Sequence, residues 1–273
     1  SKLKALDEES EKIKNDHPSE APIVNQEVKQ ISRAWDKLTQ LLKAKEAKLD
    51  QAGDLHRFLR DLDHFQAWLT KTQTDVASED TPANLVEAER LLHQHKQIKD
   101  EIDNYTDDYI SMMEYGERIT KDQRDPQYMF LRERLRALKN GWTELGRMWD
   151  NRQKFLSQNL NLQVFYRDAK QAEKLLNQQE NYLSKDEPST SLEQAEELCK
   201  KHDTMMTTME ANDEKINSVI HTAGVLADEG IINSDKIRKK AEDIRDRREA
   251  NRRKAAQLAD KLKEQLQVHQ FLQ

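Results

Sequence analysis

The stretch from Leu131 to Leu145 reads LRERLRALKNGWTEL, and the spacing of its large apolar residues predicts how the chain folds. These residues are Leu131, Leu135, Leu138, Trp142 and Leu145, which lie 4, 3, 4 and 3 positions apart. Heptad spacing of this kind places one apolar stripe along a helix and predicts coiled-coil packing against other helices.

Two other segments carry the same spacing. The first has Val24, Val28, Ile31, Trp35 and Leu38, and the second has Ile237, Ala241, Ile244, Arg248 and Asn251. The second segment therefore has an arginine where the other two have tryptophan. Burying an unpaired guanidinium is costly. We expect Arg248 either to extend to the edge of its bundle or to pair with a carboxylate on a facing helix.

The pattern also repeats over longer distances. Shifting the sequence by 107 residues aligns Leu69 with Leu176 and His95 with His202. Each period contains three helical patterns, so the sequence predicts tandem three-helix bundles. The 5 prolines separate these patterns, at positions 18, 22, 82, 126 and 188. Asn84 and Ser191 are the expected N-caps of the helices that follow two of the breaks.

The composition agrees with long helices. Of 273 residues, 36% are hydrophobic and 35% are charged, and only 6 are glycine, which favours narrow apolar stripes over one large core. The net charge of -6 combines 45 basic with 51 acidic residues, so nucleic acid is not favoured as a partner. Cys199 has no intramolecular disulfide partner. The charged start and the lack of a long apolar run predict a cytosolic protein without direct membrane insertion.

The connections between bundles are expected to be helical. Residues 154–171 continue the helical pattern without a proline. The preceding junction contains Gly53, which costs about 1 kcal/mol relative to alanine inside a helix. We therefore predict that each third helix runs directly into the first helix of the next bundle.

These features resemble the spectrin repeat family. The period, the three helices and the tryptophans in the first and third helices carry the resemblance. FQAWL at 65–69, EAERLLHQHKQIKDEID at 87–103 and GWTELGRMW at 141–149 look like the ankyrin-binding segment of β-spectrins. The implied fold is all-α, with tandem left-handed three-helix coiled-coil bundles joined by continuous helices. The implied domains are a partial repeat at 1–52, comprising the end of a second helix and a third helix, and complete repeats at 53–160 and 161–273.

The resemblance implies a non-enzymatic adaptor that binds the spectrin-binding module of ankyrin. The parent protein would pair with α-spectrin, would crosslink and cap actin, and would lie in the cytoplasm beneath the plasma membrane. No cofactor or metal is expected, because the sequence has no HExxH motif and no cluster of cysteine and histidine. The alternative is a passive rod segment, or one that only associates laterally with α-spectrin.

Two features of the sequence differ from an ordinary solvent-exposed helix face and are candidate surfaces for binding a partner. One is a polar face off the apolar stripe, formed by Arg136, Asn140, Thr143, Arg147 and Asn151. The other is the loop EGIINSDK at 229–236, which we expect to expose Ile231 or Ile232 beside Asn233. Together with the resemblance, these features give the candidate ankyrin contacts Glu114, Arg136, Asn140, Arg147, Asn233 and Asp243.

Other conspicuous side chains have structural interpretations. We expect Trp35, Trp68 and Trp142 to be core anchors, and Met205 and Met209 to fill the core of a middle helix. The histidines are expected to be structural or solvated, because His93 and His95 lie on different faces of a helix.

Overall fold

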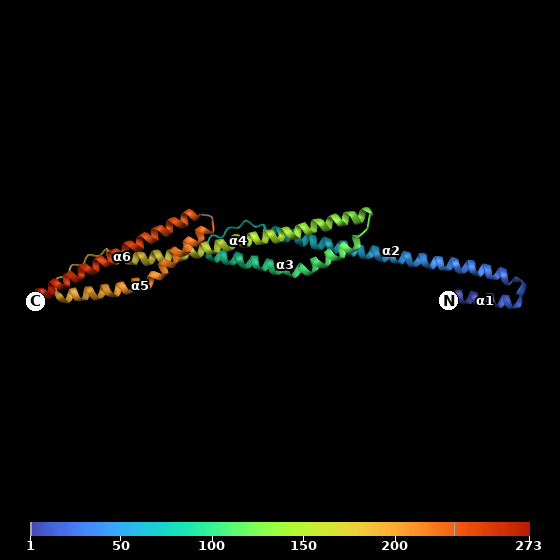
Figure 1. Cartoon of the computed structure of the whole chain (residues 1–273), viewed down its shortest axis with the longest axis horizontal. Helices are drawn as coiled ribbons and strands as arrows, with labels where there is room; N and C mark the ends of the chain where they lie inside the picture. Colours follow the sequence, from blue (N-terminus) through green and yellow to red (C-terminus); the bar gives the residue numbers. More distant parts are fainter. Residues whose placement is uncertain (1, 232) are drawn as a thin grey trace. The chain divides into compact units, whose positions relative to one another are not determined.

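The computed structural model describes residues 2–231 and 233–273, and it is helical nearly throughout. The elements are α1 (Lys2–Asp16), η1 (Pro18–Glu20), α2 (Ala21–Val76), α3 (Leu85–Thr120), α4 (Pro126–Leu183), α5 (Leu192–Asp228) and α6 (Ser234–Phe271) (Figure 1). No strand occurs within these two ranges. The all-α class predicted from the heptad spacing is therefore confirmed.

The helix boundaries lie at the prolines and capping residues of the sequence. Pro126 is the first residue of α4, where a missing N–H removes no helical hydrogen bond. Ser191 caps α5 by accepting a hydrogen bond from the backbone N–H of Gln194 at 3.2 Å. Asn84 accepts one from the N–H of Glu87 at 2.9 Å, at the start of α3. Both predicted N-caps are confirmed.

The long helices pass through the expected junctions. Gly53 lies inside α2, and residues 154–171 lie inside α4. The chain divides into two compact units, one containing residues 2–71 and 108–139 and the other containing 72–107 and 140–273. They are called unit 1 and unit 2 below, and each is described by itself.

Unit 1 contains a three-helix core built from the later part of its α2 segment, from α3 and from α4. Leu62, Leu69, Leu131 and Leu138 are fully buried in it. Gly116 permits close approach of α3 and α4, because a Cβ atom there would lie only 2.5 Å from a methyl carbon of Leu135. The first part of the heptad stripe quoted above thus forms core, as predicted.

The apolar stripe in the first half of α2 is exposed instead. Trp35 retains 42% of its surface, and Ile31, Leu38 and Leu41 are also exposed. The expectation that Trp35 is a core anchor is therefore wrong for this chain. The elements that precede α2 have only 15 and 3 residues, too few for the two partner helices that a three-helix bundle requires. Trp68 and Trp142 are half-buried.

Unit 2 contains a three-helix bundle formed by the C-terminal half of α4 with α5 and α6 (Figure 1). Its core includes Phe165, Leu176, Ile216, Ile237 and Ile244, all nearly inaccessible to solvent. Met209 is buried as expected, and Met205 is half-buried. These residues come from the apolar stripes of all three helices, so this bundle has the architecture that the repeat predicted.

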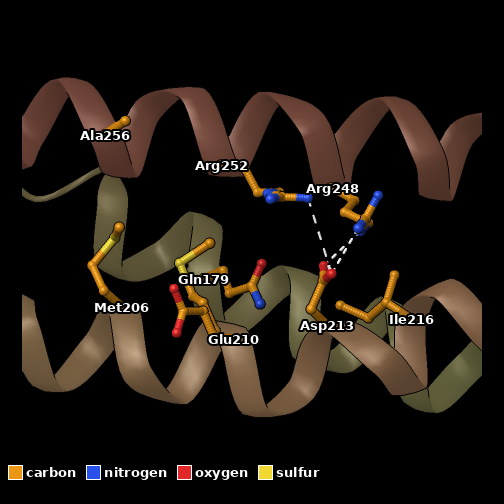
Figure 2. A pocket seen from close by; sticks show the side chains of 9 residues that line it. Gln179, Met206, Glu210, Asp213, Ile216, Arg248, Arg252 and Ala256 are labelled. Atoms are coloured by element: carbon orange, nitrogen blue, oxygen red, sulfur yellow. Dashed lines mark hydrogen bonds and ion pairs between the residues drawn. The ribbon is translucent and has the colours of Figure 1, made fainter.

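Polar residues on the α6 stripe are satisfied by partners on the other helices. Arg248 donates from Nε and Nη2 to the two carboxylate oxygens of Asp213 on α5, each at 2.6 Å (Figure 2). Its side chain is 17% exposed. Of the two alternatives for Arg248, pairing with a carboxylate of a facing helix is confirmed. Buried Asn251 similarly donates to the side chain of Gln179 on α4 at 3.2 Å.

Replacing Phe165 by alanine should destabilise the chain strongly, because its side chain is only 1% exposed in the bundle core. Truncation of a buried phenylalanine typically costs about 3–5 kcal/mol. Phe271 is 89% exposed and provides a matched control, for which a change within about 0.5 kcal/mol is expected. Urea unfolding followed by helical circular dichroism measures both variants, and equal effects would contradict the assigned core.

Candidate functional site

The polar face of α4 is exposed along its length. Arg136, Asn140, Thr143, Arg147 and Asn151 are all accessible to solvent. The intervening Leu138 and Leu145 are fully buried. Core packing thus fixes the rotation of the helix and holds the polar face outward, as the spacing predicted.

The two arginines of this face form local ion pairs. Arg147 donates from Nε to Glu144 at 2.9 Å, and Arg136 lies 3.2 Å from a carboxylate oxygen of Glu133. The hydrogen bond from Arg147 lowers the pKa of Glu144 and raises that of Arg147 itself. All four side chains are solvent-exposed, and exposed pairs of this kind contribute little to stability. The guanidinium groups can therefore exchange these partners for an external carboxylate at small cost.

The α5–α6 connection differs from its expected form. Gly230 has φ of 69° and Asn233 has φ of 73°, so the chain reverses through two left-handed residues. Ile231 between them is 6% exposed and belongs to the core cluster of the bundle. Of the two isoleucines named as alternatives for exposure, Ile231 is buried, because the reversal returns this residue to the apolar interior. Ile232 lies outside the described residues.

Asn233 is the exposed polar group of this connection. It occupies the N-cap position of α6, yet its side chain makes no capping hydrogen bond. The left-handed backbone departs from the extended conformation that an N-cap residue normally adopts. Its amide therefore remains accessible with both donor and acceptor atoms.

Asp243 lies on the exposed side of α6, between the buried residues Ala241 and Ile244. The hydrogen bond to Glu180 is the largest cause that raises the pKa of Arg247, and the negative charge of Asp243 adds to it. Arg247 itself is held by Glu180 on α4, with Nε to Oε1 at 2.8 Å. Asp243 thus presents a carboxylate beside a cation that is already paired across the bundle.

The six candidate contacts are divided between the two units. Glu114 on α3 is exposed in unit 1, which also contains Arg136. Asn140 and Arg147 share the α4 face in unit 2, where Asn233 and Asp243 belong to the loop and first part of α6. Asn140 and Arg147 are two helical turns apart, so one partner surface can reach both.

Sequence reasoning missed one contact that supports the α4 face. The rings of His95 and Trp149 stack with centroids 4.6 Å apart and planes 6° apart. His95 Nε2–H donates to the carbonyl of Trp149, and Trp149 Nε1–H donates to the carbonyl of His95, both at 2.9 Å. This reciprocal pair joins α3 to α4 only two residues beyond Arg147.

The internal repeat contained a signal for this contact. His202 aligns with His95, and its Nε2–H donates to the carbonyl of Ala255 on α6 at 2.8 Å. Both histidines are buried and bond to the backbone of the third helix of their bundle. The alignment of His95 with His202 in the internal repeat could therefore have indicated a hydrogen bond between the second and third helices of each bundle.

Comparison with known proteins agrees with this architecture. The spectrin repeat model matches residues 53–158 and 160–264. The chain belongs to the spectrin repeat family, whose helical bundles are structural modules of the spectrin cytoskeleton. Across the described residues 2–231 and 233–273, no helix has both the length and the apolar character needed to cross a membrane.

The individual relatives are spectrin chains. The sequence is 57% identical over 275 residues to the spectrin beta chain of Drosophila melanogaster, and 40% identical over 272 residues to the erythrocytic spectrin beta chain of Mus musculus. Both alignments cover 100% of this chain but only 12% and 13% of the relatives' lengths. The erythrocytic spectrin alpha chain 1 of Mus musculus is 29% identical over 93% of this chain and 10% of its own length. The chain is thus most usefully compared with a segment of spectrin beta chains.

The His95 contact predicts a pH dependence of stability. Burial, aided by the charge of Arg152, lowers the pKa of His95, although its backbone hydrogen bond opposes the shift. The unfolded chain therefore binds a proton more readily, and the free energy of unfolding should fall as pH drops below the ordinary value of 6.5. Urea unfolding between about pH 7.5 and about pH 5.5 measures this loss.

His95→Gln should lose part of that pH dependence, because the amide keeps a donor for the Trp149 carbonyl and does not titrate. The matched control is His93→Gln, since His93 is exposed on the same helix. Identical pH profiles for the parent chain and His95→Gln would contradict this assignment.

Proposed function

We propose that this chain is a non-enzymatic adaptor segment that binds the spectrin-binding module of ankyrin. In this way it links the spectrin–actin skeleton to membrane proteins at the cytoplasmic face of the plasma membrane. The observation that carries the proposal is the exposed α4 face around Asn140 and Arg147, which the buried leucines of the same helix hold outward. The similarity to spectrin beta chains over the full length of the chain supports it.

We further propose that the chain comprises a partial repeat at 1–52 and complete repeats at 53–160 and 161–273. The family matches at 53–158 and 160–264 support the two complete repeats. α4 is one helix from Pro126 to Leu183, so it passes from one proposed repeat into the next without a break. A continuous helix limits the relative rotation of contact residues on either side of the junction.

The proposed contact residues are Glu114, Arg136, Asn140, Arg147, Asn233 and Asp243. They offer guanidinium, amide and carboxylate groups, which suit a partner surface of mixed charge. Because the arginines are exposed and only locally paired, their contribution should appear chiefly in the association rate and in its salt dependence. Asn233 supplies the uncapped amide of the α5–α6 loop.

Combining Arg147→Glu with Asn233→Ala should weaken ankyrin binding by at least about tenfold, equivalent to about 1.4 kcal/mol. The charge reversal repels a partner carboxylate, and the alanine removes the loop amide. Isothermal titration at fixed salt measures the change. The control is Lys170→Glu, an equal charge reversal at an exposed α4 position outside the proposed surface. Equal affinities for the parent chain and the double variant would reject the surface.

Continuity of α4 provides a separate test. Asn161 is exposed in the interior of α4 at the proposed junction. Proline there removes a helical hydrogen bond and costs about 3 kcal/mol or more, whereas Asn161→Ala should preserve the helix. Asn161→Pro should abolish ankyrin binding while far-ultraviolet circular dichroism retains most of the helical signal. Undiminished affinity would show that a continuous junction helix is not required.

The alternative is a passive rod segment, or one that only associates laterally with α-spectrin. The spectrin repeat matches at 53–158 and 160–264 support it, because tandem repeats can form a rod segment without a ligand of their own. Ankyrin pull-down by the isolated chain separates the two functions. An adaptor retains ankyrin, whereas a passive rod segment does not.

A further inference from the structure

The bundle of unit 2 contains a slot of about 300 Å³ between α5 and α6 (Figure 2). Met206, Met209 and Ile216 contribute its apolar surface, and Glu210, Asp213 and Arg252 contribute charged groups. All of these residues lie on the last two long helices, within one compact unit. The slot is therefore a feature of a single folded bundle.

The internal repeat explains why the slot exists. Arg248 occupies the position that tryptophan holds at Trp142 in the preceding heptad stripe, and Ile216 aligns with Tyr109 at a shift of 107 residues. At each of these two positions the bundle therefore lacks an aromatic side chain that its counterpart has. Arg248 does not fill the space, because its Nε and Nη2 groups donate to the two carboxylate oxygens of Asp213, each at 2.6 Å. The missing aromatic volume remains as a slot.

The size of the slot suits a bicyclic ring. A dry apolar cavity of about 150 Å³ is sufficient to bind benzene, and this slot has about twice that volume. Met209 and Ile216 are buried, whereas Met206 is half-buried and Arg252 is exposed. A planar ligand can therefore enter from the exposed edge and reach a largely apolar floor, which also includes the buried side chain of Gln179 on α4.

The chemistry of the lining selects the class of ligand. Methionine sulfur makes favourable contacts with aromatic rings, and a guanidinium plane stacks on an aromatic face. The arginines at 248 and 252 balance the carboxylates Glu210 and Asp213, so the lining has no formal net charge. Arg252 lies 4.0 Å from Asp213 and has an exposed side chain. Its guanidinium can therefore turn onto a ring without breaking the Arg248 pair.

We propose that this slot binds a neutral aromatic ring of indole size that carries an N–H or O–H donor. The ring stacks between the side chains of Met206 and Met209 and the guanidinium of Arg252. Its N–H or O–H group donates a hydrogen bond to the carboxylate of Glu210 or Asp213. Asp213 lies roughly 20 Å along α5 from the end of that helix at Asp228, so the slot is separate from the α5–α6 loop that carries Asn233, although Asp243 precedes Arg248 by five residues on α6. Success or failure here does not depend on ankyrin binding.

Titration of the intact chain with indole tests the proposal. With ¹³C-labelled methionine methyl groups, the signals of Met206 and Met209 should shift together and saturate. Met129 is exposed on α4 in unit 1 and should remain unshifted. Lack of saturation at the two slot methionines, or an equal shift of Met129, would overturn the site.

Arg248→Trp should restore the missing ring and weaken indole binding by at least about tenfold. The matched control is Arg253→Trp, which adds the same ring at an exposed α6 position and should bind indole as the parent chain does. Ala256→Leu narrows the slot from its edge with a helix-compatible side chain and provides a second variant should Arg248→Trp fail to fold. Full indole affinity in a folded slot-filling variant would overturn the proposal.

Competition between indole and N-acetyl-tryptophanamide tests whether the slot accepts the ring of a tryptophan residue with its flanking amides. Displacement of indole supports the site and shows that a tryptophan side chain of a protein can occupy it. Saturable indole binding without displacement supports the site and limits it to rings without flanking peptide amides.

Discussion

The structure depends on burial of a heptad stripe along α4. Leu131 and Leu138 fill the core of unit 1, whereas Leu145 and Phe165 fill cores in unit 2. Each buried leucine or phenylalanine contributes roughly 1.5–3 kcal/mol relative to exposure. The same packing sets the rotation of α4 and keeps Asn140 and Arg147 in solvent. Stability and presentation of the polar face are consequences of one sequence pattern.

Polar groups on the core stripes are tolerated because partners on neighbouring helices satisfy them. Arg248 pairs with Asp213, Asn251 bonds to Gln179, and His202 bonds to a backbone carbonyl. Among the described residues, no buried side-chain nitrogen or oxygen lacks a hydrogen-bond partner. These hydrogen bonds specify which helices pack together and in which register. A shifted register would leave a buried polar atom without a hydrogen-bond partner. The bundle in unit 2 thus retains a defined core despite the loss of a tryptophan.

The helices and their ends could be predicted from sequence because their causes are local. Heptad spacing, prolines and the caps at Asn84 and Ser191 each act within a few residues. Trp35 was predicted wrongly because burial of an apolar stripe depends on what packs against it, which the spacing within one helix does not reveal. The sequence left open whether Ile231 or Ile232 is exposed, because a polar loop sequence does not reveal the left-handed residues Gly230 and Asn233.

The candidate site was predictable only in part. The α4 face followed from spacing, since the residues off an apolar stripe must face solvent. The stacking of His95 on Trp149 and the choice of Asp213 as partner of Arg248 depend on the axial register between helices. Sequence spacing on each helix leaves that register open. The slot beside Arg248 likewise could not be predicted without the side-chain geometry. From the alignment alone, the arginine side chain could equally have filled the space that tryptophan occupies in the other stripe.

We propose that this segment recognises ankyrin through an exposed, partly charged surface. The most direct measurement is a binding titration of the intact chain with the spectrin-binding module of ankyrin at several salt concentrations. We expect saturable binding whose affinity decreases as salt increases, because salt screens exposed ion pairs. Absence of binding at low salt would contradict the claim.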